Sequence, residues 1–244
     1  MSELDYSTAG VDVRDDLTES HARVWDHVGS PGTWWTGEER VAIASETRNA
    51  PGCALCRVRK AALSPSAIGG EHESDRKLAA NVVDVIHRVV TDPARLSKPW
   101  FDSVLADGLS EPEYVELIGV VTLVVGVDYF ARALGVPPLT LPEPLAGAPT
   151  RQGANSATHD AAWVPMVPQE AGASEGLYEG IDGVANVHRA LSLVPEQARA
   201  LRRFQVAHYL PTEQVADLSL HRDLDRAQME LVAARVSALN ECFY

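Results

Sequence analysis

The spacing of apolar side chains predicts helices along most of the chain. Residues 74–90 are apolar at positions 78, 82, 85, 86 and 89, a repeat of three to four residues that marks one face of a helix. Similar spacing indicates helices over residues 17–28, 195–208, 212–220 and 224–239. No segment joins strict alternation of apolar and polar residues to a hairpin turn. We therefore expect an all-α fold.

Capping and stop signals place two more helices around a pair of cysteines. Thr36 is a candidate N-cap with Glu39 three residues later, which is the pattern of a capping box, so a helix is expected over residues 37–48. The run Asn49-Ala50-Pro51-Gly52 ends it, because proline and glycine interrupt helices. Residues 53–63 can begin a new helix directly after that stop.

Residues 111–134 predict the longest helix. Its middle is rich in β-branched residues, so propensity alone would allow a strand, but the flanking stretches EPEYVEL and YFARALG favour a buried helix. The uncharged run 117–127 is shorter than the roughly 20 residues that a membrane span needs. Asp128 and Arg132 follow it at once. We therefore expect a core helix and no membrane partner.

The distribution of proline and glycine suggests how the chain is organised. Seven of the fifteen prolines fall within residues 136–168, and six glycines lie between positions 147 and 183. We interpret residues 136–183 as a Pro/Gly-rich linker with irregular, extended backbone. It would separate a helical unit over residues 31–135 from a second unit over residues 184–244. Residues 1–30 would form an N-terminal arm.

Charge and composition narrow the range of partners and compartments. The 34 acidic and 21 basic side chains give a formal charge of −13. Nucleic acid and anionic lipid both attract basic surfaces, so neither is expected as the main partner. Hydrophobic residues make up 45% of the 244 positions, which suffices for a globular core. Residues 1–16 lack the basic and apolar regions of a signal peptide, so we expect a cytoplasmic protein.

The chain holds three cysteines, Cys53, Cys56 and Cys242. In a cytoplasmic protein we expect them to be core residues or working thiols, not a disulfide scaffold. Residues 38–56 and 229–244 run alike, each from a helix through a turn with asparagine to a cysteine. This likeness predicts two copies of one helical unit.

The second of these segments resembles a known family. From Arg226 the chain reads RAQMELVAARVSALNECFY, which is similar to the core of the alkylhydroperoxidase AhpD-like family, within the carboxymuconolactone decarboxylase superfamily. Glu230 stands twelve residues before Cys242, which matches the family's spacing from glutamate to cysteine. Residues 36–56 resemble the same core more loosely, and residues 114–135 resemble the family's long buried helix. The resemblance implies two AhpD-like helical units and homo-oligomers.

Two positions depart from the family pattern. Where the family has a histidine four residues after its second motif cysteine, the first segment has Lys60. In the second segment, the second motif cysteine would be residue 245, one position after Tyr244. Some family members carry selenocysteine there, encoded by UGA. We therefore expect a selenoprotein whose coding sequence continues in frame past a UGA after codon 244, with cysteine at 245 as the alternative.

A Cys-x-x-Cys pair at the start of a helix suits thiol redox chemistry. The free N–H groups and partial positive charge of a helix N-terminus stabilise a thiolate. Two intervening residues let the sulfurs meet across one turn, so a sulfenic acid on one cysteine is captured by the other. Arg57, Arg59 and Lys60 would favour the anion further.

The resemblance implies that a glutamate and a histidine supply the proton path. Glu230 is the candidate glutamate of the second segment, and Glu39 or Glu46 that of the first. His72 is the candidate histidine, and His87 is the other histidine close in sequence to Cys56.

Simpler interpretations stay open for these residues. Cys53 and Cys56 could be inert core residues. They could also bind zinc, but a structural zinc site needs four ligands, which only His72, His87 or Cys242 could complete. Redox chemistry is our preferred interpretation, and we expect no metal and no cofactor.

The acid and base candidates have ordinary alternatives too. Glu230 lies in an otherwise apolar helix and could form an ion pair with Arg226 or Arg235. His72, in the run GGEHESD, could be a solvated loop residue, and His87 could be a core or surface residue.

These observations predict a thiol or selenol peroxidase that reduces a hydroperoxide and is recycled by a thiol or dithiol reductant protein. Cys53 and Cys56 would be one redox pair, and Cys242 would resolve residue 245. One alternative is a lyase of the carboxymuconolactone decarboxylase type, which would keep its activity after Cys53→Ser and Cys56→Ser. The other is a non-enzymatic oligomeric protein, whose thiols would neither ionise near neutral pH nor form a disulfide under mild peroxide.

Overall fold

The computed structural model describes residues 6–178, 183–215, 217–240 and 242, and it confirms an all-α protein. Within these residues there is no β-strand, only two isolated β-bridges. The helices are α1 (Asp15–Gly29), α2 (Gly37–Asn49), α3 (Ala54–Ala61), α4 (Ala80–Thr91), α5 (Lys98–Ala106), α6 (Glu111–Ala133), α7 (Asn186–Arg189), α8 (Pro195–His208), α9 (Thr212–Val215) and α10 (Arg226–Leu239).

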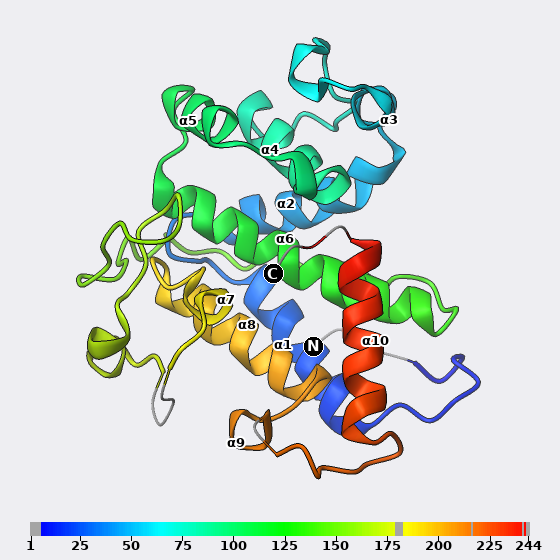
Figure 1. Ribbon diagram of the computed structural model, residues 1–244. Coiled ribbons are helices and arrows are strands. Elements are labelled where there is room, and N and C mark those ends of the chain that lie inside the picture. Colours follow the sequence, from blue (N-terminus) through cyan, green and yellow to red (C-terminus); the bar gives the residue numbers. More distant parts are fainter. Residues whose placement is uncertain (1–5, 179–182, 216, 241, 243–244) are drawn as a thin grey trace.

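Helix α6 is the centre of the fold. It contacts α1, α2, α4 and α8, and Figure 1 shows α4 on one side of it and α1 with α8 on the other. Leu117, Leu123 and Val127 are among its completely buried side chains. By length and composition this helix could cross a membrane, yet more than half of its most apolar stretch is buried against other helices. Its surroundings are those of a core helix.

A buried ion pair fixes the entry to α2 against α6. The Nε of Arg40 lies 3.7 Å from Oε1 of Glu116, and both side chains are almost fully buried. The backbone N–H of Trp34 donates to the other oxygen of Glu116, at 2.6 Å. A Cβ at Gly32 would lie 1.7 Å from Oε1 of Glu116, so only glycine fits there. Gly32, in the segment between α1 and α2, therefore makes room for a buried carboxylate.

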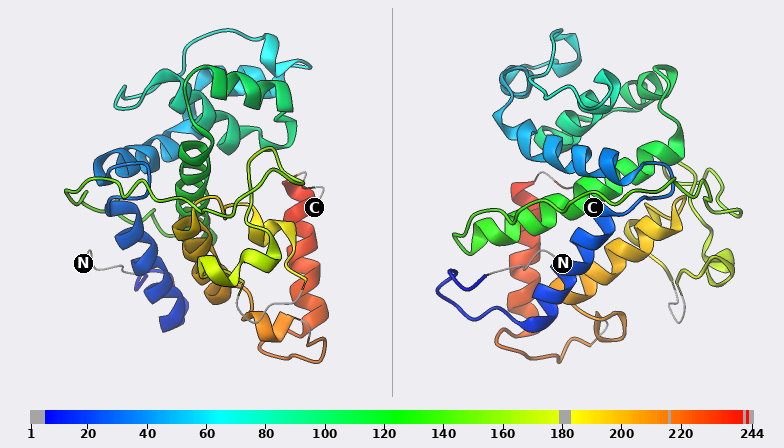
Figure 2. Two further views of the ribbon diagram at one scale, coloured as in Figure 1. Left: turned by 90° about the vertical axis from the view of Figure 1, so that its left-hand side faces the viewer. Right: turned by 180° about the vertical axis from the view of Figure 1, so that it is seen from behind.

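The proline-rich connection is packed and not helical. Residues 136–168 contain no helix, and two 3₁₀ turns follow at Gln169–Ala171 and Ala173–Glu175. Val164, Val167 and Leu177 are buried with Val194 of the segment before α8 in a second apolar cluster. The views in Figure 2 show this segment running along the outside of the helices. Its irregular backbone is thus held by apolar contacts.

Two predicted helices are much shorter than expected, and two short helices were missed. Helix α4 begins at Ala80 instead of position 74, because Ser74 and Asp75 accept the backbone N–H groups of Arg76 and Lys77 and Arg76 has φ 61°. Helix α9 ends at Val215, and residues 217–220 form a turn in which Asp217 accepts the N–H of Ser219. Short polar side chains thus compete with the helix. Neither α5 nor the four-residue α7 was predicted.

The two proposed repeat segments have different surroundings. Helix α2 has its predicted capping box and packs against α1, α4 and α6. Helix α10 also has a capping box, but Arg226 is its only buried residue. Its apolar side chains face solvent, including Leu231, Val236 and Leu239. The internal repeat therefore stays a prediction.

Candidate functional site

Both cysteines of the Cys-x-x-Cys pair lie at the start of α3. Helix α2 passes into a 3₁₀ turn, Ala50–Gly52, and Cys53 is the residue from which α3 begins. Cys56 follows one helical turn later. Both side chains are buried and both are free thiols. The two residues lie 3.7 Å apart, farther than a disulfide bond of about 2.05 Å, and a small movement would close one.

Two histidines from different parts of the chain complete the site. His72 belongs to the irregular segment between α3 and α4, and its Nδ1 lies 3.5 Å from the sulfur of Cys53 and 3.5 Å from that of Cys56. His87 belongs to α4, and its Nδ1 lies 3.2 Å from the sulfur of Cys56. The two sulfurs and two nitrogens all lie within 4.8 Å of one another.

Each histidine is oriented by a carboxylate on its far side. The Nε2–H of His87 donates to Oε1 of Glu46 at 2.7 Å, and the Nε2–H of His72 donates to Oδ1 of Asp84 at 2.9 Å. Because each Nε2 carries a proton, each Nδ1 is free to accept a proton from a thiol or to bind a metal ion. The carboxylates therefore decide which atom of each ring faces the sulfurs.

The two carboxylates are themselves held in place by neighbouring donors. The side chains of Asn49 and Ser74 donate to Glu46, which is almost completely buried. Arg59 of α3 donates to Asp84 at 2.6 Å and forms an ion pair with it. Helices α2, α3 and α4 and the segment between α3 and α4 are thus joined through polar side chains around the thiols.

The site shifts the pKa values of its own members. Burial raises the pKa of the Cys56 thiol, but hydrogen bonds from His72 and His87 outweigh it and bring that pKa to about 6. The pKa of Cys53 is also lowered, because backbone amides and His72 outweigh burial. Burial lowers the pKa of His72, whereas hydrogen bonds with Asp84 and the thiols raise it to about 10. A thiolate on Cys56 beside an imidazolium is therefore favoured.

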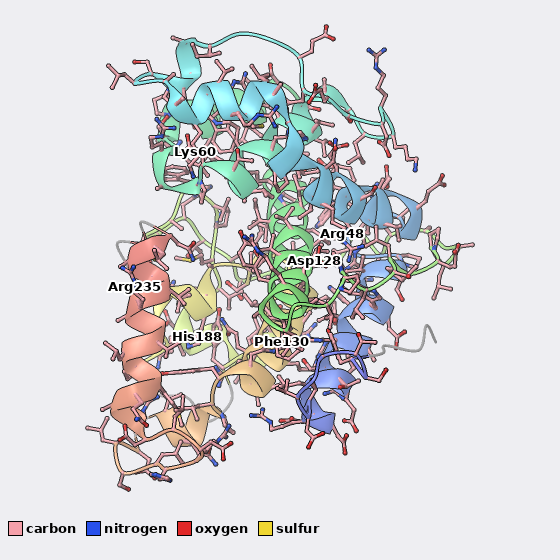
Figure 3. The ribbon with its side chains drawn as sticks, turned by 90° about the vertical axis from the view of Figure 1, so that its right-hand side faces the viewer. Arg48, Lys60, Asp128, Phe130, His188 and Arg235 are labelled. Carbon is pink, nitrogen blue, oxygen red and sulfur yellow. The ribbon has the colours of Figure 1, made fainter. Side chains whose placement is uncertain are left out.

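The other predicted site residues lie outside this cluster. Glu230 forms an ion pair with Arg226 at 2.6 Å, and Tyr209 donates a hydrogen bond to it. Cys242 is exposed after the end of α10, and residues 241, 243 and 244 lie outside the described part of the chain. Lys60, at the position of the family histidine, is exposed and donates to the carbonyl of Thr91; Figure 3 shows it near the outer edge of the molecule.

His87 has a larger part in the site than the sequence indicated, and no pattern in the sequence singled out Asp84. The sequence favoured a core or surface position for His87 and offered Glu46 only as one of two possible glutamates. One signal was available: Asp84 and His87 stand three residues apart on one helix, so their side chains share a face. What the sequence does not contain is the fold of residues 62–79, which brings His72 back to the start of α3.

A cavity of about 250 Å³ lies elsewhere, beside α7 and α8. Its wall includes His188, Arg199 and Arg202, and it contains none of the four thiol and imidazole side chains. Figure 3 shows His188 on the side of the molecule that carries α10, away from α3. Apolar residues such as Leu191 and Leu201 also line it. Its chemistry is separate from that of the cysteines.

Comparisons with known proteins give no match for this chain, whether with protein-family models, with curated proteins or with solved structures. The resemblance to the AhpD-like family thus depends on the residues quoted above.

Proposed function

We propose that the protein reduces hydroperoxides through Cys53 and Cys56. The observation that carries the proposal is the position of Cys56, whose sulfur faces Nδ1 atoms of two histidines while a second thiol lies 3.7 Å away. A nucleophile, a proton donor and a resolving thiol therefore share one site. The resemblance to the AhpD-like family supports the same chemistry.

Cys56 is the attacking thiol in this proposal, because it contacts both histidines while Cys53 contacts His72 alone. Its thiolate attacks one oxygen of the peroxide, the O–O bond breaks, and an imidazolium gives its proton to the departing alkoxide. The products are a sulfenic acid on Cys56 and an alcohol. Cys53 then attacks that sulfur, a disulfide forms and water leaves.

The carboxylates keep the histidines in the form that this reaction needs. Glu46 and Asp84 accept the Nε2–H of His87 and His72, so each ring presents Nδ1 to sulfur. They also stabilise the positive charge of an imidazolium, as a carboxylate does for a catalytic histidine. A proton taken from Cys56 is thereby held within reach of the oxygen that must receive it.

Burial of the sulfurs bears on the substrate and on the reductant. Cys53 and Cys56 are 1% and 3% exposed, so a small hydroperoxide reaches them more easily than a bulky one. The disulfide must then be reduced by an external thiol or dithiol, which takes two electrons from outside for each peroxide. A small dithiol is a suitable reductant in a first assay.

The test uses reduced, metal-free protein and stoichiometric hydrogen peroxide. We expect peroxide consumption and the loss of two hydrogens by intact mass, with peptide mapping that joins Cys53 to Cys56. The Cys53→Ser variant should stop at a sulfenic acid that dimedone traps on Cys56. The Cys56→Ser variant should lose rapid reaction with peroxide.

The Cys242→Ser variant is the matched control, because Cys242 is exposed and lies outside the cluster. It should react as the parent protein does. Equal peroxide consumption by the parent and the Cys56→Ser variant would refute the proposal. So would a disulfide that always includes Cys242.

A further inference from the structure

The four donor atoms of the site have the spacing of a tetrahedral metal centre. With Zn–S bonds of about 2.3 Å and Zn–N bonds of about 2.0–2.1 Å, tetrahedral geometry requires S···S of about 3.8 Å and S···N of about 3.6 Å. Cys53 and Cys56 lie 3.7 Å apart, and the S···N distances are 3.5, 3.5 and 3.2 Å. All six distances between pairs of the four donor atoms lie below 4.8 Å.

The position of His72 fits a metal better than a hydrogen bond. Its Nδ1 is 3.5 Å from each sulfur, and a single N–H cannot point well at both. A cation between the three atoms would instead be bound by all of them. The rings of His72 and His87 also lie with centroids 4.2 Å apart, where two imidazolium charges repel each other but two neutral ligands do not.

The carboxylates complete the pattern. Histidines that bind zinc usually donate their other ring N–H to a carboxylate, which fixes the ring and makes the ligating nitrogen more basic. Here both histidines do so, His87 to Glu46 and His72 to Asp84. Glu46 receives further hydrogen bonds from Asn49 and Ser74, so its orientation is fixed as well.

We propose that the reduced site binds one Zn²⁺ through Cys53, Cys56, His72 and His87. Binding takes up the metal and releases the protons that the thiols and imidazoles hold, with no change of oxidation state. A disulfide between the cysteines removes two of the four ligands, so zinc and the disulfide exclude each other. This proposal does not depend on peroxidase activity, because it needs only the reduced thiols and the neutral imidazoles.

Cobalt(II) is the probe, since it takes the place of zinc and reports its ligands by colour. Reduced, metal-free protein is titrated with Co²⁺ without oxygen. We expect intense visible bands of tetrahedral cobalt, a thiolate-to-cobalt charge-transfer band, an end point of one metal per chain, and loss of colour when Zn²⁺ is added. The oxidised protein should show none of these.

Variants distinguish the proposed metal ligands from the carboxylates that accept hydrogen bonds from the histidines. Cys56→Ser or His87→Asn should remove the tetrahedral spectrum. Glu46→Gln should keep it and weaken binding by about 10- to 100-fold, as expected for loss of a carboxylate behind a ligating histidine. Cys242→Ser should change nothing. Circular dichroism of each metal-free variant shows whether it is folded before metal is added.

The inference is overturned if folded, reduced protein gives no tetrahedral spectrum. It is also overturned if the Cys53→Ser/Cys56→Ser variant binds cobalt as tightly as the parent protein. Neither result bears on peroxide reduction, which is measured on metal-free protein. Conversely, an inert thiol pair that still binds one zinc would refute the proposed peroxidase and leave the metal site standing.

Discussion

At the scale of single residues, the chemistry of the protein depends on which side chains are kept from water. Cys56, His72 and His87 are buried or nearly so, and each would be poorly ionised alone. Together they exchange a proton, so that the thiolate and the imidazolium stabilise each other. The same principle keeps buried His21 neutral, because its neighbours Tyr6 and His208 offer it no negative charge.

The first prediction concerns the ionisation of Cys56. In the metal-free Cys53→Ser/Cys242→Ser variant Cys56 is the one remaining thiol, and its alkylation by iodoacetamide should be half-maximal at about pH 6, where its pKa lies. His87→Asn in that background should move the midpoint upward, because the hydrogen bond from His87 lowers the pKa. A midpoint close to the ordinary value of 9.0 before His87 is changed would contradict the site described here.

The second prediction concerns His21, which is buried between Tyr6 and His208. The hydroxyl of Tyr6 donates to Nδ1 of His21, whose Nε2–H donates to Nε2 of His208. His208 in turn donates its Nδ1–H to the carbonyl of Phe204. Each ring nitrogen therefore has a hydrogen-bond partner while both rings are neutral. Burial, and then the charge of His208, lower the pKa of His21 to about 3.

Because the folded pKa is lowered, the contribution of His21 to stability is complete above about pH 6.5 and falls as the unfolded chain takes up a proton. Between about pH 7.5 and about pH 5.5 this loss is about 1.4 kcal/mol. His21→Gln cannot titrate, so the difference in unfolding free energy between the parent and this variant should shrink by about that amount. Urea denaturation at both pH values measures it, and a constant difference would contradict the prediction.

At the scale of elements, the sequence was sufficient to predict those helix starts and breaks that depend only on neighbouring residues. The capping box at Thr36 and Glu39 and the break before Cys53 depend on neighbouring residues, and both were predicted. The cysteine pair was likewise recognisable because its members are three residues apart. His72 and His87 lie 19 and 31 residues from a cysteine they contact, so their role depends on tertiary packing that no local pattern contains.

The third prediction contrasts a buried leucine of α6 with an exposed leucine of α10. Leu123 of α6 is completely buried and Leu231 of α10 is 72% exposed. Leu123→Ala should cost about 2 to 5 kcal/mol of unfolding free energy, because it leaves a cavity in the core. Leu231→Ser should change it by less than about 0.5 kcal/mol, as expected for an exposed position.

Chemical denaturation of both variants tests this contrast between α6 and α10. A large cost for Leu231→Ser that also depends on protein concentration would show that α10 is covered in solution by another copy. That outcome would agree with the homo-oligomer that the family resemblance implies, and it would correct the exposure of α10 described here.

At the scale of the whole molecule, the thiol site joins α3 and the segment after it to the helical core. Cys53 and Cys56 lie at the start of α3, His72 in the irregular segment after it, and His87 in α4, which packs on α2 and α6. Figure 1 shows α3 at the edge of the molecule, away from α8 and α10. A ligand that holds all four side chains therefore fixes α3 and residues 62–79 to the core.

The last prediction follows from this arrangement. Zinc at about 100 times its dissociation constant should stabilise the reduced protein by about 2.7 kcal/mol. For a chain of this size that raises the melting temperature by roughly 5 to 10 °C. A disulfide between Cys53 and Cys56 closes a very short loop and so restricts the unfolded chain little. Scanning calorimetry should therefore show a zinc-dependent rise for the reduced protein and none for the oxidised protein, whereas an equal rise in the Cys53→Ser/Cys56→Ser variant would place the metal elsewhere.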